Sequence, residues 1–178
     1  MNYSILVKPI IAKEKGYVDH PSDRGGPTKD GITEYVARAN GWHGRMQDLP
    51  DSMIEEIYIN RYIKGPGFDF VHTISPVIGE ELIDTGVNMG PSVAAMFFQR
   101  LLNAFNSQES HYHDVFVDGK IGPVTIDAFK KYLKRRGDEG AIVMLKALNH
   151  IQGGKYLSLA ESNKTQEDFF YGWIKNRT

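Results

Sequence analysis

The sequence predicts an α+β protein that is predominantly α-helical, with one small β-hairpin region near residues 17–32. Apolar residues recur at helical spacing along most of the chain, and glycines and prolines separate these stretches. Residues 14–33 depart most from that pattern, because they combine four glycines and two prolines with several acidic side chains. The hairpin is therefore expected inside this segment.

The expected helices follow from these breaks, in chain order. They cover residues 3–15, 33–39, 51–62, 76–87, 92–105, 123–136, 139–152 and 166–177. Pro9 either begins the first helix or kinks it. Residues 92–105 are the most apolar stretch and are expected to form the central buried helix, whereas residues 106–122 are polar and rich in turns.

Capping residues define several of these helix starts. Thr33, then Asp51 or Ser52, and later Asp138 precede apolar periodic stretches and suit the N-cap position. Ser75-Pro76 and Pro123 place proline in a first helical turn. Thr165 with Asp168 resembles a capping box for the last helix.

Composition excludes several classes of protein. The chain has no cysteine, which rules out disulfides, zinc–thiolate sites and cysteine nucleophiles. Its 21 basic and 22 acidic side chains give a net charge of −1, which argues against nucleic-acid binding. Lys8 and Pro9 interrupt the N-terminal apolar run, so we expect no signal peptide, and no run is long enough for a stable membrane insertion. We expect the protein to be made, and to accumulate, in a cytoplasm.

Glu14 is the first candidate catalytic residue, because it lies at the end of a predicted helix that Gly16 terminates. A carboxyl there meets the negative end of the helix dipole, which favours its protonated form. A general acid needs such a proton. The alternative is a solvated glutamate at a frayed helix end.

Asp23 and Thr28 follow Glu14 in the same segment. Glycoside hydrolysis uses two carboxyl groups on opposite sides of the sugar, and Asp23 can supply the second. The Thr28 hydroxyl can hold a water against Asp23. In the other interpretation, "PSDRGG" is a turn in which Asp23 bonds backbone.

The segment "EKGYVDHPSDRGGPTKDGIT" resembles the signature of glycoside hydrolase family 108, N-acetylmuramidases found mainly as phage endolysins. The matching positions are Glu14, Gly16, Tyr17, Asp23, Gly25, Gly26, Thr28, Gly31 and Ile32. Lys15 stands where the family usually has glycine. The resemblance implies a lysozyme-like, two-lobed fold without metal or organic cofactor.

The same resemblance implies a role for each matching residue. Glu14 would protonate the leaving oxygen, and Asp23 with Thr28 would position or activate water. The resemblance also implies that the sugar chain is bound near Tyr17, Gly26 and Gly31, where glycine lets the loop run close to it.

A second stretch, "IDTGVNMGPSVAAMFFQRLLN", is similar to a later segment of that family, and "FFYGWIKNR" looks like its C-terminal ending. Asp84, Asn88, Gly90 and Gln99 match. Asp84 and Asn88 lie four apart on one helix face, where they can bind sugar groups or form a cap or buried hydrogen-bond network. The resemblance extends the substrate-binding set to Gln99.

The stretch "FVDGKIGPVTIDAF" resembles the turn-into-helix motif of peptidoglycan-binding domains. In that reading Asp118 and Thr125 contact the wall, and helix N-terminal amides bind a stem-peptide carboxylate. The alternative is a helix start that only packs. We therefore expect a lysozyme-like catalytic region at residues 1–105 and a packed C-terminal lobe at residues 106–178.

Three weaker patterns have plain structural explanations. Tyr58 and Tyr62 share a helix face, either as a platform for sugar or as core. "HYH" at 111–113 with Asp114 is a poor metal motif and fits a solvated loop. "KKYLKRR", residues 130–136, is a solvated helix end or a surface that attracts anionic envelope polymers.

Together these patterns predict a monomeric endolysin whose partner is the glycan strand of peptidoglycan. It would cleave the β-1,4 bond between N-acetylmuramic acid and N-acetylglucosamine, stay in the host cytoplasm until released, and act on the wall from the periplasm. The alternatives are a non-catalytic peptidoglycan-binding module and a lytic transglycosylase on the same scaffold.

Overall fold

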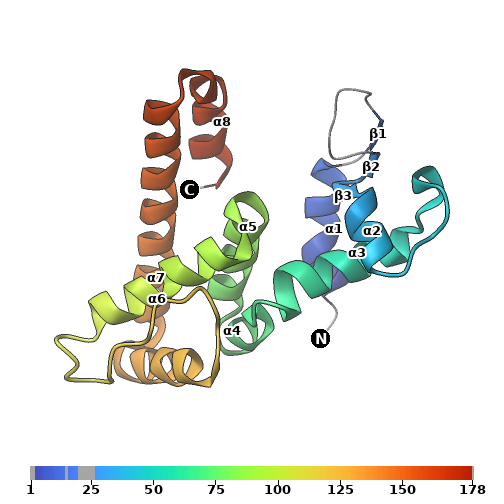
Figure 1. Ribbon diagram of the computed structural model, residues 1–178. Coiled ribbons are helices and arrows are strands. Elements are labelled where there is room, and N and C mark those ends of the chain that lie inside the picture. Colours follow the sequence, from blue (N-terminus) through green and yellow to red (C-terminus); the bar gives the residue numbers. More distant parts are fainter. Residues whose placement is uncertain (1–2, 15, 20–26, 178) are drawn as a thin grey trace. The chain divides into compact units, whose positions relative to one another are not determined.

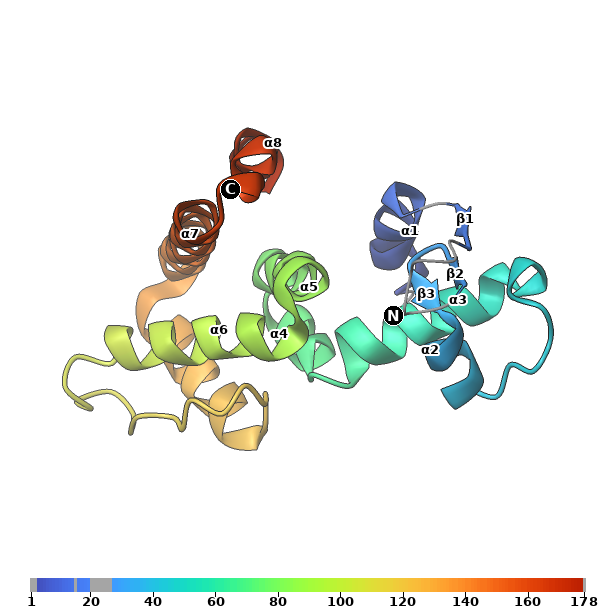
Figure 2. The ribbon, with the colours of Figure 1, turned by 45° about the horizontal axis from the view of Figure 1, so that its top comes forward.

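The computed structural model describes residues 3–14, 16–19 and 27–177 (Figures 1 and 2). Helices dominate, and a small three-stranded antiparallel sheet is present, which confirms the predicted fold class. The chain divides into two compact units, Met1–Arg61 and Tyr62–Thr178.

The first unit combines helices with the sheet. Its elements are α1 (Ser4–Lys13), β1 (Tyr17–Val18), β2 (Thr28–Lys29), β3 (Ile32–Thr33), α2 (Glu34–Ala39), the 3-10 helix η1 (Met46–Asp48) and α3 (Asp51–Ile59). The strands lie in the order β1-β2-β3, with Val18 opposite Thr28 and Thr28 opposite Thr33. The hairpin region is therefore where the glycine-rich segment predicts it.

Local sequence explains most helix boundaries of this unit. The Thr33 hydroxyl accepts a hydrogen bond from the Val36 amide at 3.4 Å, so the predicted N-cap of α2 is confirmed. Helix α1 begins before Pro9 and continues through it. The predicted caps of α3 are wrong: Pro50 is the N-cap and Asp51 is already helical. Proline fixes the extended entry to α3 without a side-chain hydrogen bond.

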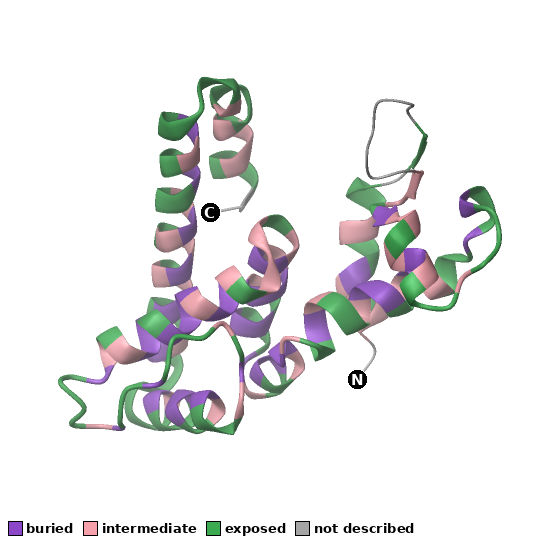
Figure 3. Cartoon of the chain, in the orientation of Figure 1, coloured by how far each residue is buried: buried purple, intermediate pink, exposed green. Residues whose placement is uncertain are grey.

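The second unit is built from helices around α6. After the π-helical turn η2 (Asn60–Lys64) it contains α4 (Phe68–Ile74), α5 (Pro76–Met89), α6 (Pro91–Phe105), α7 (Pro123–Ser162), the 3-10 helix η3 (Lys164–Gln166) and α8 (Glu167–Arg177). Ala94, Ala95, Phe98 and Leu102 of α6 are fully buried (Figure 3). The prediction of a central buried helix is confirmed.

Helix α7 differs from the prediction in length. Gly137 breaks it with φ 61° and ψ −151°, at the predicted boundary between two helices. The second half then reaches Ser162, ten residues beyond the predicted end at 152. Leu148, Gln152 and Tyr156 are buried four residues apart, so the packed stripe continues across Gly153-Gly154. Tertiary packing outweighs the low helix propensity of these glycines.

The predicted capping box of the last helix is wrong. The Asn163 side chain, rather than that of Thr165, is the cap, and it accepts hydrogen bonds from the Thr165 amide at 3.1 Å and hydroxyl at 2.9 Å. These bonds begin η3, and α8 starts only at Glu167. Trp173 of α8 stacks on Tyr156 of α7 with ring centroids 4.9 Å apart, which fastens the two helices together.

A polar layer joins α5 to α7 inside the second unit. The Thr85 hydroxyl donates to the Glu81 carboxylate at 3.1 Å and accepts from the fully buried Gln152 amide at 3.1 Å. With its amide nitrogen toward Glu81, Asn149 donates to both carboxyl oxygens. Burial is the main cause that raises the pKa of Glu81 to about 7; the Thr85 hydrogen bond opposes it, and the Asp84 carboxylate adds to it.

This pKa makes stability depend on pH. Glu81 stays protonated to about pH 7 when folded, against an ordinary pKa of 4.5, so the folded state binds more protons between these values. The free energy of unfolding should therefore fall as pH rises from 4.5 to 8, by up to about 3 kcal/mol. Urea unfolding at several pH values should show that Glu81→Gln flattens this fall. A Glu139→Gln control, on an exposed part of α7, should show the same fall in the free energy of unfolding as wild type. Equal pH slopes in the two variants would contradict the assignment of this pH dependence to Glu81.

Gly79 tests the packing of α5 on α4. A Cβ at Gly79 would lie 2.4 Å from both Cα and Cβ of His72, so Gly79→Ala should destabilise the protein by about 2–3 kcal/mol. Gly154 of α7 has no neighbour within 4 Å of such a Cβ, and Gly154→Ala should stabilise by about 0.5–1 kcal/mol. Thermal unfolding measures both, and a tolerated Gly79→Ala would refute the close contact.

Candidate active site

Glu14 is the C-cap residue of α1. Its backbone has φ −93° and ψ 4°, and its amide donates to the Ile11 carbonyl at 3.0 Å. The side chain is exposed. The helix end predicted from Gly16 is thus present, and the carboxyl stands at the negative end of the helix, open to a ligand.

A turn at Asp30-Gly31 lies against this helix end. The Gly16 amide donates to the Asp30 carboxylate at 2.8 Å, and the Asp30 amide donates back to the Gly16 carbonyl at 3.0 Å. The Tyr58 hydroxyl of α3 donates to the Asp30 carbonyl at 3.1 Å. These three bonds hold Asp30 in the left-handed region, at φ 48°, which few residues adopt without such support.

Gly31 must be glycine for a steric reason as well. Its φ is +79°, and a Cβ there would lie 2.4 Å from the Tyr58 hydroxyl and 3.4 Å from the Glu14 Cβ. The turn therefore lies next to Glu14, with room for no more than one additional carbon between them. Tyr58 itself is buried, which favours the core interpretation of this tyrosine over a sugar platform.

The remaining residues of the segment lie on or beside the sheet. Thr28 is half-buried in β2, between Val18 and Thr33. The Tyr17 hydroxyl donates to the Asp19 carboxylate at 3.0 Å, and desolvation together with Asp19 raises the pKa of Tyr17. Asp23 and Gly26 lie outside the described residues. The predicted pairing of Asp23 with Glu14 and Thr28 stays a prediction.

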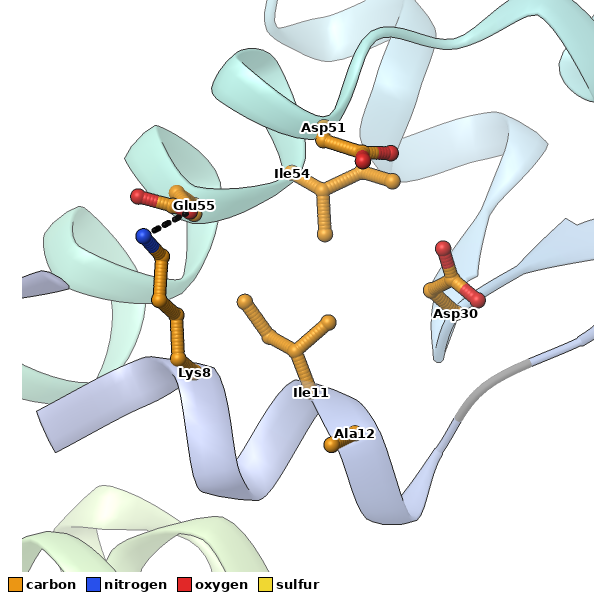
Figure 4. A pocket seen from close by; sticks show the side chains of 7 residues that line it. All are labelled: Lys8, Ile11, Ala12, Asp30, Asp51, Ile54 and Glu55. Atoms are coloured by element: carbon orange, nitrogen blue, oxygen red, sulfur yellow. Dashed lines mark ion pairs between the residues drawn. The ribbon is translucent and has the colours of Figure 1, made fainter. Parts of the chain in front are cut away.

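A hollow of about 300 Å³ adjoins the same turn, and no sequence motif pointed to it directly (Figure 4). Its lining comes from α1, α3 and the turn: Lys8, Ile11, Ala12, Asp30, Asp51, Ile54 and Glu55. Ile11 and Ile54 point toward each other, and Lys8 pairs with Glu55 at 3.6 Å. In each helix the lining residues follow i, i+3, i+4 spacing and so share one face. This spacing predicts a common hollow only once the two helices are known to pack against each other. Carboxylates beside an apolar floor suit hydroxyl-bearing ligands.

Asp84 and Asn88 share one face of α5, as their spacing predicts. The Asn88 amide donates to the Asp84 carbonyl at 2.7 Å and to its carboxylate at 3.1 Å. Asn88 is exposed and Asp84 is half-buried. The hydrogen-bonding interpretation thus has support within the helix, and contact with substrate stays a prediction.

The structure brings Gln99, Asp118 and Thr125 together. The buried Gln99 amide donates to the Asp118 carboxylate and the Lys120 carbonyl at 2.9 Å each, and lies 3.5 Å from the Thr125 hydroxyl. Its oxygen accepts from the Gly119 amide at 2.9 Å. The hydrogen bond from Gln99, and then that from the Lys120 amide, lowers the pKa of Asp118. Gln99 therefore fastens this loop to α6, a role that its position 19 residues before Asp118 did not reveal.

The loop that Gln99 holds borders a second hollow of about 300 Å³, lined partly by Asp118 and Thr125. Phe116 and Val124 are exposed at this hollow, with 84% and 69% of their surface accessible. Gly119 lies so close to α6 that a Cβ would come within 2.2 Å of the Ser92 hydroxyl. The turn-into-helix motif is therefore rigidly placed, with apolar side chains at its surface.

Neither a metal centre nor a membrane-spanning helix is found in the described residues. Within residues 3–14, 16–19 and 27–177, no three His, Asp or Glu side chains gather to hold an ion. His113 instead pairs with Glu109 at 2.8 Å, and His111 lies 3.1 Å from the Ser110 hydroxyl. No helix in these same ranges has the length and apolar character needed to cross a bilayer.

Comparisons with known proteins agree with the two motifs. Residues 7–90 match the family described as Glycosyl hydrolase 108, and residues 93–178 match the family described as Predicted Peptidoglycan domain. The two matches support a glycoside hydrolase segment followed by a peptidoglycan-directed one.

Among solved structures, nine chains match. One, titled "Structure of Brucella abortus SagA", has 22% identity and a TM-score of 0.61, over 97% of this chain and 87% of that one. This likeness shows a shared fold. No curated protein matches the chain.

The contact between Gly31 and Tyr58 can be tested with a double-mutant cycle. Gly31→Ala should cost about 2–3 kcal/mol, because it adds both a clash and left-handed strain. In a Tyr58→Phe background the clash with the hydroxyl is gone, so the same change should cost only about 1 kcal/mol. Gly41, with φ +87° and open space around it, gives the strain alone as a Gly41→Ala control. Additive free energies of unfolding would contradict the contact.

Proposed function

We propose that the protein is a muramidase, which hydrolyses the β-1,4 bond between N-acetylmuramic acid and N-acetylglucosamine in peptidoglycan. The observation that carries this proposal is the position of Glu14: an exposed carboxyl at the end of α1, braced by the Asp30-Gly31 turn. It lies within the segment that matches Glycosyl hydrolase 108. The match to Predicted Peptidoglycan domain supports the choice of polymer.

In the proposed reaction Glu14 donates its proton to the glycosidic oxygen as the bond from the muramic acid C1 to that oxygen breaks. Water then adds to C1, and its proton leaves to a base. We assign Asp23 as the group that positions or activates this water, with help from the Thr28 hydroxyl. Thr28 is a strand residue of β2, so its backbone is fixed by bonds to both neighbouring strands.

The other predicted contacts are part of the same proposal. Tyr17, Gly26 and Gly31 would lie along the sugar chain near Glu14, and Asp84 with Asn88 would bind N-acetyl or hydroxyl groups. Gln99 would act indirectly, by holding the loop that carries Asp118, and Thr125 would border the wall contact. We assign catalysis to residues 1–105 and wall contact to residues 106–178. We further propose that a monomer acts as a phage endolysin on the wall after release from the host cytoplasm.

Replacement of Glu14 tests the chemistry. Glu14→Gln removes the proton but keeps the shape, so clearing of outer-membrane-permeabilised Gram-negative cells should slow about 10²–10⁴-fold. Glu56→Gln, on an exposed face of α3, is the matched control and should clear at the wild-type rate. Circular dichroism checks the fold of each variant. Equal clearing by Glu14→Gln and wild type would refute the assignment of the acid.

Mass spectrometry of the products identifies the reaction. Hydrolysis gives reducing muramic acid ends, whereas a lytic transglycosylase gives ends that are lighter by one water. Release of reducing glucosamine ends would place the cut at the other glycosidic bond. Binding to purified sacculi without any clearing would identify a non-catalytic wall-binding module.

A further inference from the structure

A basic hollow of about 550 Å³ lies in the second unit and includes part of the basic stretch 130–136. We use the name basic hollow for the site lined by Ser110, His111, Lys131, Lys134 and Arg135. Two come from the segment after α6 and three from the first half of α7 (Figure 1, yellow and orange). Lys131, Lys134 and Arg135 follow i, i+3, i+4 spacing and so share one helix face.

The charges of the basic hollow are only partly compensated within the protein. Lys131 pairs with Asp127 of its own helix at 2.7 Å. In the part of the chain that the structure describes, Lys134 and Arg135 have no carboxylate within 4 Å. Two cations that face an open hollow without a counter-ion favour an anionic ligand.

The acids nearest in sequence to Ser110 and His111 are engaged elsewhere. Glu109 pairs with His113 at 2.8 Å, and Asp114 accepts a hydrogen bond from the buried Asn106 amide. Neither acid lines the basic hollow. The site is therefore one of donors: ammonium and guanidinium groups, a hydroxyl and an imidazole.

The loop wall of the basic hollow is held in place before any ligand arrives. Ser107, Gln108 and Glu109 all have left-handed φ values, of 55°, 59° and 59°. The side-chain oxygen of Asn106 accepts a hydrogen bond from the Glu109 amide at 3.2 Å, and the Tyr112 hydroxyl donates to the Leu102 carbonyl at 2.7 Å. Burial raises the pKa of Tyr112 to about 12, so this donor stays protonated. A preformed wall reduces the entropy that binding must offset.

We propose that the basic hollow binds carboxylate groups of peptidoglycan, and thereby holds the chain on the wall. The inference rests on the proposed function for its choice of polymer. Arginine recognises carboxylates through paired hydrogen bonds, and Lys134 beside it adds a mobile donor. Stem peptides present such carboxylates repeatedly, so many copies along the wall can occupy one open site in turn. The hollow lies within residues 93–178, which match Predicted Peptidoglycan domain.

Co-sedimentation with purified sacculi tests the proposal. All proteins carry Glu14→Gln, so that the polymer is not digested during the assay, and circular dichroism checks each fold. Arg135→Glu should weaken binding about 10-fold at low salt. Lys155→Glu changes the net charge equally on the exposed second half of α7 and should have less than about 2-fold effect. Equal losses in the two variants would overturn a specific site.

Chemical treatment of the sacculi identifies the anion. Conversion of the carboxylates to neutral amides should remove the difference between Arg135→Glu and its parent. A difference that survives amidation but disappears when hydrofluoric acid strips phosphate-bearing polymers would overturn the carboxylate assignment in favour of phosphate.

This inference and the proposed function can fail separately. Sedimentation does not depend on bond cleavage. A protein that binds through Arg135 but releases no product in the wild-type form would contradict the muramidase proposal alone. A protein that cleaves peptidoglycan, and whose Arg135→Glu variant binds sacculi as well as its parent, would contradict this inference alone.

Discussion

The reciprocal hydrogen bonds between Gly16 and Asp30 are the constraint on which the first unit depends. They join the residues that follow α1 to the turn between β2 and β3. Without them, Asp30 would have to hold a left-handed conformation unaided. The same bonds place Gly31 beside Glu14, where an added Cβ would lie 3.4 Å from the Glu14 Cβ. A residue at a helix end is ordinarily free to fray, and here a distant turn and Tyr58 prevent it.

In the second unit, a buried side-chain amide holds a loop against a helix. Gln99 uses its nitrogen for Asp118 and Lys120 and its oxygen for the Gly119 amide. An unpaired buried amide would be costly, and the loop would lack partners for its own polar groups. The loop thus supplies hydrogen-bond partners for the Gln99 amide, and Gln99 supplies partners for the polar groups of the loop. In both units, therefore, a loop bearing candidate contacts is fixed by hydrogen bonds from a helix rather than by its own sequence.

Those long-range bonds mark the limit of what the sequence could predict. The place of Glu14 followed from local rules, since Gly16 ends a helix that begins a dozen residues earlier. The helix breaks at Gly90-Pro91 and Gly137 could also be predicted from local sequence. Glycine allows a positive φ, and proline lacks the amide hydrogen that continues a helix, so each residue interrupts the helix at its own position. The length of α7 was not predictable from Gly153-Gly154, because packing against other helices decides it.

The same distinction separates the parts of the site. The hollow beside Glu14 needs α1 and α3 to pair, and the bond from Gln99 to Asp118 spans 19 residues. The cap is Asn163 and not Thr165. Both residue types are favourable N-caps, so helix-capping propensity alone could not distinguish between these two nearby positions. Local chemistry thus located the candidate acid, and tertiary contacts decided which polar residues serve structure.

Charge placement adds a constraint that net charge conceals. The chain carries −1 overall, yet the hollow near Glu14 is lined by Asp30, Asp51 and the Glu55–Lys8 pair. In the basic hollow, Lys134 and Arg135 have no carboxylate within 4 Å among the residues that the structure describes. Carboxylates accept hydrogen bonds from neutral sugar hydroxyls but repel the carboxylates of a stem peptide. Cations instead attract the carboxylates of a stem peptide. If the proposed function holds, a polymer of neutral sugars and acidic peptides would be sorted by the two surfaces, with sugars at the hollow beside Glu14 and peptides at the basic hollow. Salt should act mainly on the second contact, because attraction between full charges is screened whereas a hydrogen bond to a hydroxyl is affected far less.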